Sequence, residues 1–236
     1  MSTFVFFHVG ADLSQPTAMV ASLRKHNPGA EIIQVTDKDT PTIPGVTWAH
    51  PTEGNPDYLM LWRTRAFAAL QLAQPALYMD TDMLVRRPLH PELLLGDAVI
   101  AVTRRSFQRG AIFNAKQRGQ DYSENAGKTL DAVYPYIGCC TITPDGFAWE
   151  QLAEMYDRLE PKYKTWYGDQ EVLREYVNRL PPFLVAHLPE HQYACLPEHF
   201  DKHPNPVIVH YKGARKALFT GDAQAELQLN TDPSSP

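Results

Sequence analysis

Short apolar runs alternate along this chain with segments whose apolar residues recur at helical spacing. Residues 4–9 are aromatic or β-branched apart from one histidine, and residues 32–36 are rich in isoleucine and valine, so both predict buried strands. Between them, the spacing of apolar residues predicts a helix over residues 14–26, which an Asn-Pro-Gly sequence ends. A strand, a helix and a second strand in close succession predict the opening of a parallel α/β sheet.

The same alternation continues through the chain and predicts a single domain over residues 1–220. Further strands are expected at 46–48, 76–79, 98–102, 136–143, 183–186 and 207–209, and helices at 55–73, 90–95, 144–159 and 168–180. No internal repeat and no linker interrupts the pattern. Residues 221–236 form a tail that is expected to be partly disordered, because it ends in threonine, aspartate, serine and proline.

Residues 103–132 break the alternation, and we call this segment the basic flap. It has three glycines, little periodicity and six basic residues: Arg104, Arg105, Arg109, Lys116, Arg118 and Lys128. A stretch of this length without structure of its own is usually functional or disordered. The sequence leaves two interpretations open, a mobile flap over a site and a solvated surface loop.

Composition restricts the class of protein. The 236 residues are 44% hydrophobic and 11% aromatic, which suits a globular core. A net charge of -5 excludes a global basic field for a nucleic-acid backbone or an acidic membrane. The three cysteines, two of them adjacent, form neither a disulfide framework nor a zinc-like pattern. We expect a cytoplasmic protein, because neither a signal sequence nor a membrane span is recognisable.

Two aspartates directly follow one of the predicted strands. Asp80 and Asp82 end the apolar run of residues 76–79, and a second short apolar run begins after them. Ligands bind at the carboxyl ends of strands in open α/β sheets, and residues two apart in an extended chain point the same way. Two carboxylates held close together favour a cation between them. The pair alone leaves a metal site and a loop acid beside a helix cap equally open.

A second polar segment follows the predicted strand at 207–209. It contains His210, Gly213 and Lys216. One imidazole nitrogen with two carboxylates suits Mn²⁺ better than Ca²⁺, with Mg²⁺ as the alternative. Gly213 would let backbone amides approach phosphate oxygens, and Lys216 would place a point charge on the same phosphates. The two segments together predict a metal–diphosphate site.

Three motifs that occur in order carry a family resemblance: Leu77-Tyr78-Met79-Asp80-Thr81-Asp82, Gly168-Asp169-Gln170 and His210-Tyr211-Lys212-Gly213-Ala214-Arg215-Lys216. With these motifs the chain resembles the glycosyltransferase A fold, and most closely family 8 glycosyltransferases and related sugar transferases with the Asp-x-Asp motif. The resemblance extends from the first predicted strand to Lys216. It implies a single-domain α/β fold with a Rossmann-like, mostly parallel central sheet flanked by helices.

The resemblance also implies roles for individual residues. Asp80, Asp82 and His210 would hold Mn²⁺ against a nucleotide diphosphate, and Asp80 would also reach the donor sugar or ribose. Asp169 would bind sugar hydroxyls and Gln170 would lie near the anomeric carbon, which makes them the candidate catalytic residues. Further contacts with the donor are implied for Asp12, Asp37, Arg65 (with Arg63 as the alternative), Gly138, Gly213 and Lys216.

The chain departs from the family pattern in three places. Tyr136-Ile137-Gly138-Cys139 stands where Asn-Ala-Gly-Val is frequent, so an asparagine that would contact the sugar is missing. Ala217-Leu218 replaces the usual Pro-Trp, and Asp169-Gln170-Glu171 replaces the commoner Asp-Gln-Asp. These differences affect the identity of the donor and the stereochemical outcome more than the binding of metal or diphosphate.

The activity implied by the resemblance is that of a hexosyltransferase. It would move a sugar from a nucleotide-diphosphate donor, with a UDP-sugar favoured, to an acceptor hydroxyl with retention of configuration. The acceptor could be a saccharide, a protein or a modified nucleic-acid base. The sequence determines neither the acceptor nor the oligomeric state.

Three other classes stay open as alternatives. A haloacid-dehalogenase-like phosphatase also has Asp-x-Asp after a strand, but it expects the first strand and a threonine where this chain has Leu84. A sugar nucleotidyltransferase needs a glycine-rich phosphate loop that residues 9–12 do not supply. A non-catalytic binding module, with the basic flap as its docking surface, would leave the joint occurrence of Asp80, Asp82 and His210 unexplained.

Overall fold

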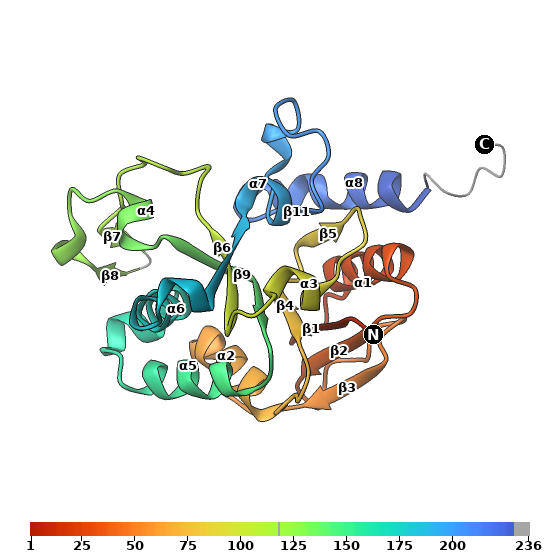
Figure 1. Ribbon diagram of the computed structural model, residues 1–236, viewed down its shortest axis with the longest axis horizontal. Helices are drawn as coiled ribbons and strands as arrows, with labels where there is room; N and C mark the ends of the chain where they lie inside the picture. The colour runs from red at the N-terminus through yellow and green to blue at the C-terminus, as the bar shows by residue number, and fades with distance from the viewer. Residues whose placement is uncertain (118, 229–236) are drawn as a thin grey trace.

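A seven-stranded sheet forms the centre of the protein, as seen in a computed structural model that describes residues 1–117 and 119–228 (Figure 1). The strand order is β10-β6-β9-β4-β1-β2-β3. Neighbouring strands are parallel, except that β9 runs antiparallel to β4 and β6. The predicted mostly parallel, Rossmann-like sheet is therefore confirmed. The strands are β1 (Thr3–Phe7), β2 (Glu31–Thr36), β3 (Trp48–Pro51), β4 (Ala76–Met79), β6 (Ile100–Arg104), β9 (Tyr136–Thr143) and β10 (Val185–Pro189).

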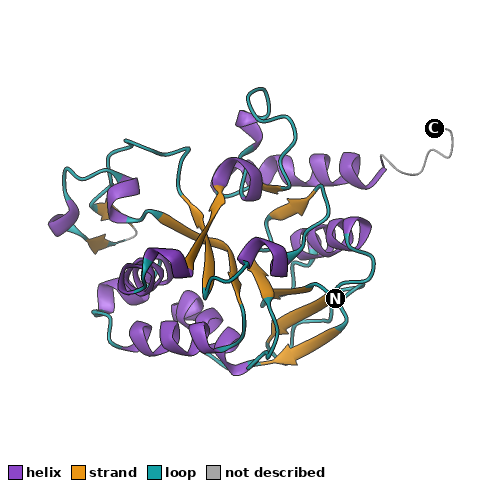
Figure 2. Ribbon diagram, viewed as in Figure 1, coloured by secondary structure: helices purple, strands orange, loops and turns teal. Residues whose placement is uncertain are grey.

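Helices cover both faces of this sheet (Figure 2). One face packs against α1 (Ser14–His26) and α3 (Pro91–Leu95), with α7 (Glu190–Tyr193) nearby; the other packs against α2 (Leu59–Ala69), α5 (Phe147–Asp157) and α6 (Gly168–Arg179). None of the described helices combines the length and the apolar character that crossing a membrane requires.

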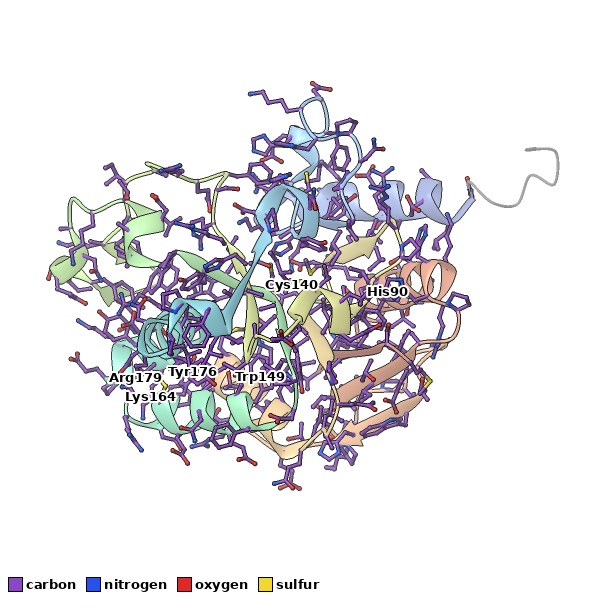
Figure 3. The ribbon with its side chains drawn as sticks, in the orientation of Figure 1. His90, Cys140, Trp149, Lys164, Tyr176 and Arg179 are labelled. Atoms are coloured by element: carbon purple, nitrogen blue, oxygen red, sulfur yellow. The ribbon has the colours of Figure 1, made fainter. Side chains whose placement is uncertain are left out.

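The core consists of one apolar layer on each face of the sheet. Phe4 and Phe6 of β1 face the α1 layer while Val5 faces the α2 layer, and all three are fully buried. Figure 3 shows the same division, with Cys140 on the α3 side and Trp149 and Tyr176 on the side of α5 and α6. Because both faces are covered, the central strands read as continuous apolar runs.

A two-stranded antiparallel sheet joins two distant parts of the chain. It pairs β5 (Met83–Val85) with β11 (Ile208–His210), so that His210 lies opposite Met83. Helix α8 (Lys216–Gln228) follows and packs against α1 (Figure 1). Helical structure therefore continues beyond the expected boundary at residue 220, because α8 has an apolar face to bury. The rest of the expected tail, residues 229–236, lies outside the described residues.

Several elements differ in position from the prediction, among them β6, which begins two residues after the expected 98. The short strand is β3, two residues after the expected 46–48. The helix expected at 55–73 begins with a 3₁₀ turn (Pro56–Tyr58), in which the Asn55 side chain accepts from the Asp57 amide, and ends at Ala69 before Gln71, whose φ is +46°. The strand expected at 183–186 is a 3₁₀ turn (Pro182–Leu184) followed by β10.

The basic flap has structure of its own, contrary to expectation. It contains β7 (Lys116–Gln117), β8 (Gln120–Asp121), a 3₁₀ turn (Ser123–Asn125) and the start of α4 (Leu130–Val133). Aromatic burial explains the order, because side chains spaced irregularly in sequence meet in one small cluster: Phe113, Tyr122, Val133 and Tyr134. Mobility of the flap stays a prediction.

Candidate active site

A cleft with a volume of about 700 Å³ lies beyond the carboxyl ends of β1 and β4. This is the edge at which open α/β sheets bind ligands. The ends of β1, β4 and β11, the α2 helix, the loop before α6 and the base of the flap all contribute to its lining. Its polar lining includes Arg63, Asp80, Asp82, Arg105, Asp169, Gln170, His210, Lys212, Arg215 and Lys216.

The three predicted metal ligands lie together at this cleft. Asp80 follows β4, Asp82 precedes β5 and His210 ends β11, and one donor atom of each lies within 4.8 Å of the other two. The His210 Nε2 and Asp82 Oδ1 atoms are 3.3 Å apart. The Tyr211 amide also donates to the Asp82 carbonyl at 2.9 Å, which ties the two strand ends together. Pairing of β5 with β11 thus closes a site whose halves are far apart in sequence.

His210 and Lys216 lie beside the two oxygens of the Asp82 carboxylate. Lys216 Nζ lies 3.1 Å from Asp82 Oδ2, on the opposite oxygen from His210. Burial opposes ionisation, but the hydrogen bond from His210 and the charges of His210 and Lys216 outweigh it, so the pKa of Asp82 is well below its ordinary value. Asp82 is therefore ionised at neutral pH and available to a cation.

Gly213 and Lys216 belong to the segment that turns from β11 into α8. Gly213 adopts a φ of +67°, and the space around its Cα is open toward the cleft. That conformation favours glycine and begins a 3₁₀ turn (Gly213–Arg215) directly before α8. The turn directs Lys216 back toward Asp82. Contact of the Gly213 backbone with a diphosphate stays a prediction.

Arg63 joins the metal ligands to the candidate catalytic residues. Its Nη1 donates to Asp80 Oδ1 at 2.6 Å and its Nη2 to Asp169 Oδ2 at 2.7 Å. Burial disfavours the guanidinium charge, but the two carboxylates raise the pKa of Arg63 above its ordinary value. Asp80 and Asp169, which lie on different elements, are thus held on one side of the cleft by a single side chain.

The structure corrects the expectation that Arg65 contacts the donor. Arg65 points away from the cleft, is 56% exposed at its side chain and pairs with Asp157. Successive residues of a helix are rotated by about 100°, so Arg65 faces almost opposite to Arg63. The open alternative, Arg63, is the arginine of α2 that reaches the site.

Asp169 and Gln170 open α6 at the wall of the cleft. The Asp169 Oδ1 atom accepts from the Gln170 amide at 2.8 Å, and the Gln170 Oε1 atom accepts from Arg105 Nη2 at 2.7 Å. Gly138 of β9 faces this pair: a Cβ there would come within 2.9 Å of Asp169 Oδ2. The absence of a side chain at Gly138 therefore leaves space for the Asp169 carboxylate.

Asp12 and Asp37 are not among the residues that line the cleft. Asp12 accepts from the amide and hydroxyl of Ser14, and these bonds hold its pKa below the ordinary value. Asp37 accepts from the amides of Asp39 and Thr40 in a tight turn. Both carboxylates serve local backbone structure at the start of α1 and after β2, beside the cleft residue His8. Their contact with a nucleotide stays a prediction.

Sequence reasoning passed over two cations of the cleft. Lys212 lies inside the His210–Lys216 motif, with its Nζ 3.7 Å from the buried Glu190. Arg105, counted only as a charge of the basic flap, is 8% exposed and reaches Gln170. The sequence could have pointed to Arg105 as a cleft residue, because Arg105 directly follows the strand β6 just as Asp80 directly follows β4.

Several solved structures that are similar to this chain are glycosyltransferases. A glycosyltransferase involved in the glycosylation of the major capsid of PBCV-1 is similar to this chain with a TM-score of 0.61, 13% identity, and coverage of 94% of this chain and 98% of its own. GlyE of Streptococcus pneumoniae TIGR4 gives 0.60 and 16%, with 97% of this chain covering 60% of GlyE. The galactosyltransferase LgtC, solved with donor and acceptor sugar analogs, gives 0.56, 17%, and 98% of each chain.

The comparison of structures identifies the fold. No protein-family model and no curated protein matches this sequence. At 13 to 17% identity the likeness over nearly the whole chain nevertheless shows that this protein has the glycosyltransferase A fold, as the motifs predicted.

Proposed function

We propose that this protein is a metal-dependent glycosyltransferase that transfers a hexose from a UDP-sugar to an acceptor hydroxyl with retention of configuration. The observation that carries the proposal is the group formed by Asp80, Asp82 and His210, with Lys216 beside it, in the cleft of a glycosyltransferase A fold. Neither a phosphatase nor a plain binding module accounts for this group on this fold.

The donor set suits a divalent cation. Two carboxylates and one imidazole offer atoms within 4.8 Å of one another, and oxygen with nitrogen ligation favours Mn²⁺, with Mg²⁺ as the alternative. Burial and the neighbouring Asp82 raise the pKa of Asp80, against the attraction of Arg63, so a cation would relieve an unfavourable carboxylate pair. When bound, the ion would supply electrostatic stabilisation of the charge on a leaving diphosphate.

The chain's own cations face the same space. Lys216, Lys212 and Arg215 line the cleft on the side of the predicted metal ligands, and Gly213 leaves its backbone accessible. Lysine acts on phosphate as a point charge. Lys216 and Lys212 lie 3.1 and 3.7 Å from single carboxylate oxygens, whereas Arg215 donates to both oxygens of Glu198 and is held more firmly. We therefore assign the diphosphate contacts to Lys216, Lys212 and the backbone at Gly213.

The transferred sugar would lie against Asp169 and Gln170. The carboxylate of Asp169 is engaged by Arg63 and by the Gln170 amide, and the Gln170 oxygen is engaged by Arg105. Neither group is therefore free to act as a nucleophile. This favours attack on the front face: the bond from the anomeric carbon to the diphosphate oxygen breaks, the acceptor oxygen bonds to that carbon, and the acceptor proton leaves with the diphosphate.

Isothermal titration calorimetry with UDP and Mn²⁺ tests the proposal. We expect wild-type protein to bind UDP with Mn²⁺ present, and EDTA to weaken binding at least about tenfold, because the ion would bridge carboxylates and diphosphate. Asp82→Asn should show the same loss. Asp97→Asn is the matched control, because Asp97 is exposed and lines neither described cavity.

Two results would contradict the proposal: no binding of UDP by the wild type, or binding that is indifferent to both EDTA and Asp82→Asn. Hydrolysis of a panel of nucleotide sugars then identifies the donor. A substrate with a base other than uracil would correct the preference for UDP while leaving the transferase proposal intact.

A further inference from the structure

A second cavity of about 430 Å³ adjoins the cleft, between the base of the basic flap and the β10–α7 segment. It is lined on the flap side by Arg104, Arg105, Ser106, Arg109 and Asp131, and on the other side by His187, Pro189, Glu190 and His191. Three of these residues are arginines. The site described above makes no use of this space.

Arg105 forms the partition between the two cavities and lines both. Its guanidinium donates to the Tyr134 carbonyl at 2.9 Å and to the amide oxygens of Gln108 and Gln170 at 2.7 Å each. All three acceptors are neutral, and within the described ranges 1–117 and 119–228 no carboxylate forms an ion pair with Arg105. A nearly buried positive charge is thus left without a contacting negative charge, which is costly unless a ligand supplies one.

The two carboxylates that line the second cavity accept hydrogen bonds from backbone amides. Glu190 Oε2 accepts from the amides of Ser106 and Phe107, and Asp131 Oδ1 accepts from the Gly110 amide at 2.9 Å. Arg104 and Arg109 are both exposed and have no ion pair with any described residue. Glu190 and Asp131 keep their negative charges, and Lys212 lies 3.7 Å from Glu190. The three arginines of the lining outnumber the two carboxylates, so the cavity has a small excess of positive charge.

The position of this cavity relates it to the transfer reaction. A single side chain, Arg105, separates it from Gln170, the residue expected near the anomeric carbon. A volume of about 430 Å³ lies within the ordinary range for small-molecule sites and accommodates a monosaccharide with a charged substituent. With its charged group at Arg104 and Arg109, a bound molecule would have to extend past Arg105, where the two cavities meet, to place a hydroxyl at Gln170.

We propose that the second cavity is the acceptor subsite and that it takes a saccharide carrying an anionic group, a phosphate or a carboxylate. This inference rests on the proposed transferase function. Among the acceptor classes that the sequence left open, this proposal selects the saccharide, because the cavity has the volume of a small-molecule site and three arginines line its flap side. Arg104 and Arg109 bind the anionic group, and Arg105 aligns the acceptor with Gln170.

Calorimetry on the protein loaded with UDP and Mn²⁺ tests this inference, because UDP is expected to occupy the cleft and to leave the second cavity free. The probes are glucose 6-phosphate, glucuronate and uncharged glucose. We expect at least one charged sugar to bind about tenfold or more tightly than glucose, and Arg104→Gln/Arg109→Gln to abolish that preference. Lys116→Gln/Lys128→Gln removes the same charge from the flap at residues that line neither cavity, and should preserve it.

The outcomes separate the two proposals. Preference for glucose 6-phosphate identifies a phosphate, and preference for glucuronate a carboxylate. Equal or undetectable binding of all three sugars, or a preference that survives Arg104→Gln/Arg109→Gln, overturns the inference. UDP affinity should change less than about twofold in that variant and fall in Lys216→Gln. Failure of the wild type to bind UDP at all would instead overturn the transferase proposal.

Discussion

Arg63 joins the two functional halves of the candidate site through one buried side chain. It contacts Asp80, a predicted metal ligand, and Asp169, a candidate catalytic residue, and both contacts are shorter than 3 Å. Removing it would leave two carboxylates in a protein interior without their partner. The energetic consequence differs from that of Arg65, which lies on the same helix but pairs with Asp157 at the surface.

We predict that Arg63→Gln lowers the free energy of unfolding by about 3 kcal/mol, because breaking a buried ion pair strands the remaining charges. Arg65→Gln should lower it by less than about 1 kcal/mol, since exposed pairs are screened by water. Urea denaturation followed by circular dichroism measures both. Equal losses in the two variants would show that Arg63 is not the buried bridge.

A buried carboxylate near the end of helix α8 adds to the apolar packing that holds this helix to the domain. Glu226 is 7% exposed; its side chain pairs with His26 Nε2 at 3.1 Å and Arg86 Nε at 3.0 Å, and also with Lys25. Burial opposes its ionisation, but these three partners outweigh burial and lower the pKa of Glu226. Since α8 begins at Lys216, its docking also determines where that lysine lies.

Glu226→Gln should lower the free energy of unfolding by about 2 kcal/mol at pH 7, the contribution of hydrogen bonds to a charged group. A lowered folded pKa stabilises the protein above the ordinary value of 4.5, and this contribution disappears as the pH falls through the folded pKa. The difference between wild type and variant should therefore shrink below about pH 4.5. Denaturation curves from pH 7 to 3 measure it, with the exposed Glu154→Gln as the neutral control. A difference that is constant with pH would contradict this account.

At the scale of the whole molecule, the metal-ligand group exists only when distant segments are assembled. Asp80 and Asp82 lie between β4 and β5, while His210 and Lys216 come from the far end of the chain. An unfolded chain has no such group. Ligands that bind it must therefore stabilise the folded state by mass action.

UDP with Mn²⁺, at a hundred times its dissociation constant, should stabilise the protein by about 2.7 kcal/mol. For a chain of this length that corresponds to a rise in Tm of about 5–10 °C. Differential scanning fluorimetry measures the shift, which EDTA or Asp82→Asn should remove. An identical shift with UDP in the presence of EDTA would argue against a metal in the site.

The sequence by itself determined which segments form buried strands, because such strands read as apolar runs. In a parallel sheet the polar residues that follow the strands gather at the carboxyl edge, which is why Asp80 and Asp82 were expected at a site. His210 was predicted to join them, and it does so through the separate pairing of β5 with β11. The resemblance in motif order then predicted the glycosyltransferase A fold, which the structural comparisons confirmed.

Only the tertiary structure decided which charged side chains face the cleft. Arg63 rather than Arg65 reaches it, and Arg105 is drawn from the basic flap into a nearly buried position. The aromatic cluster that orders the flap was also invisible, because its members are irregularly spaced. Local periodicity encodes which face of an element is buried. The partner that each polar side chain finds depends on contacts between residues far apart in the chain. Through such contacts Arg105 comes to line both the cleft and the second, basic cavity.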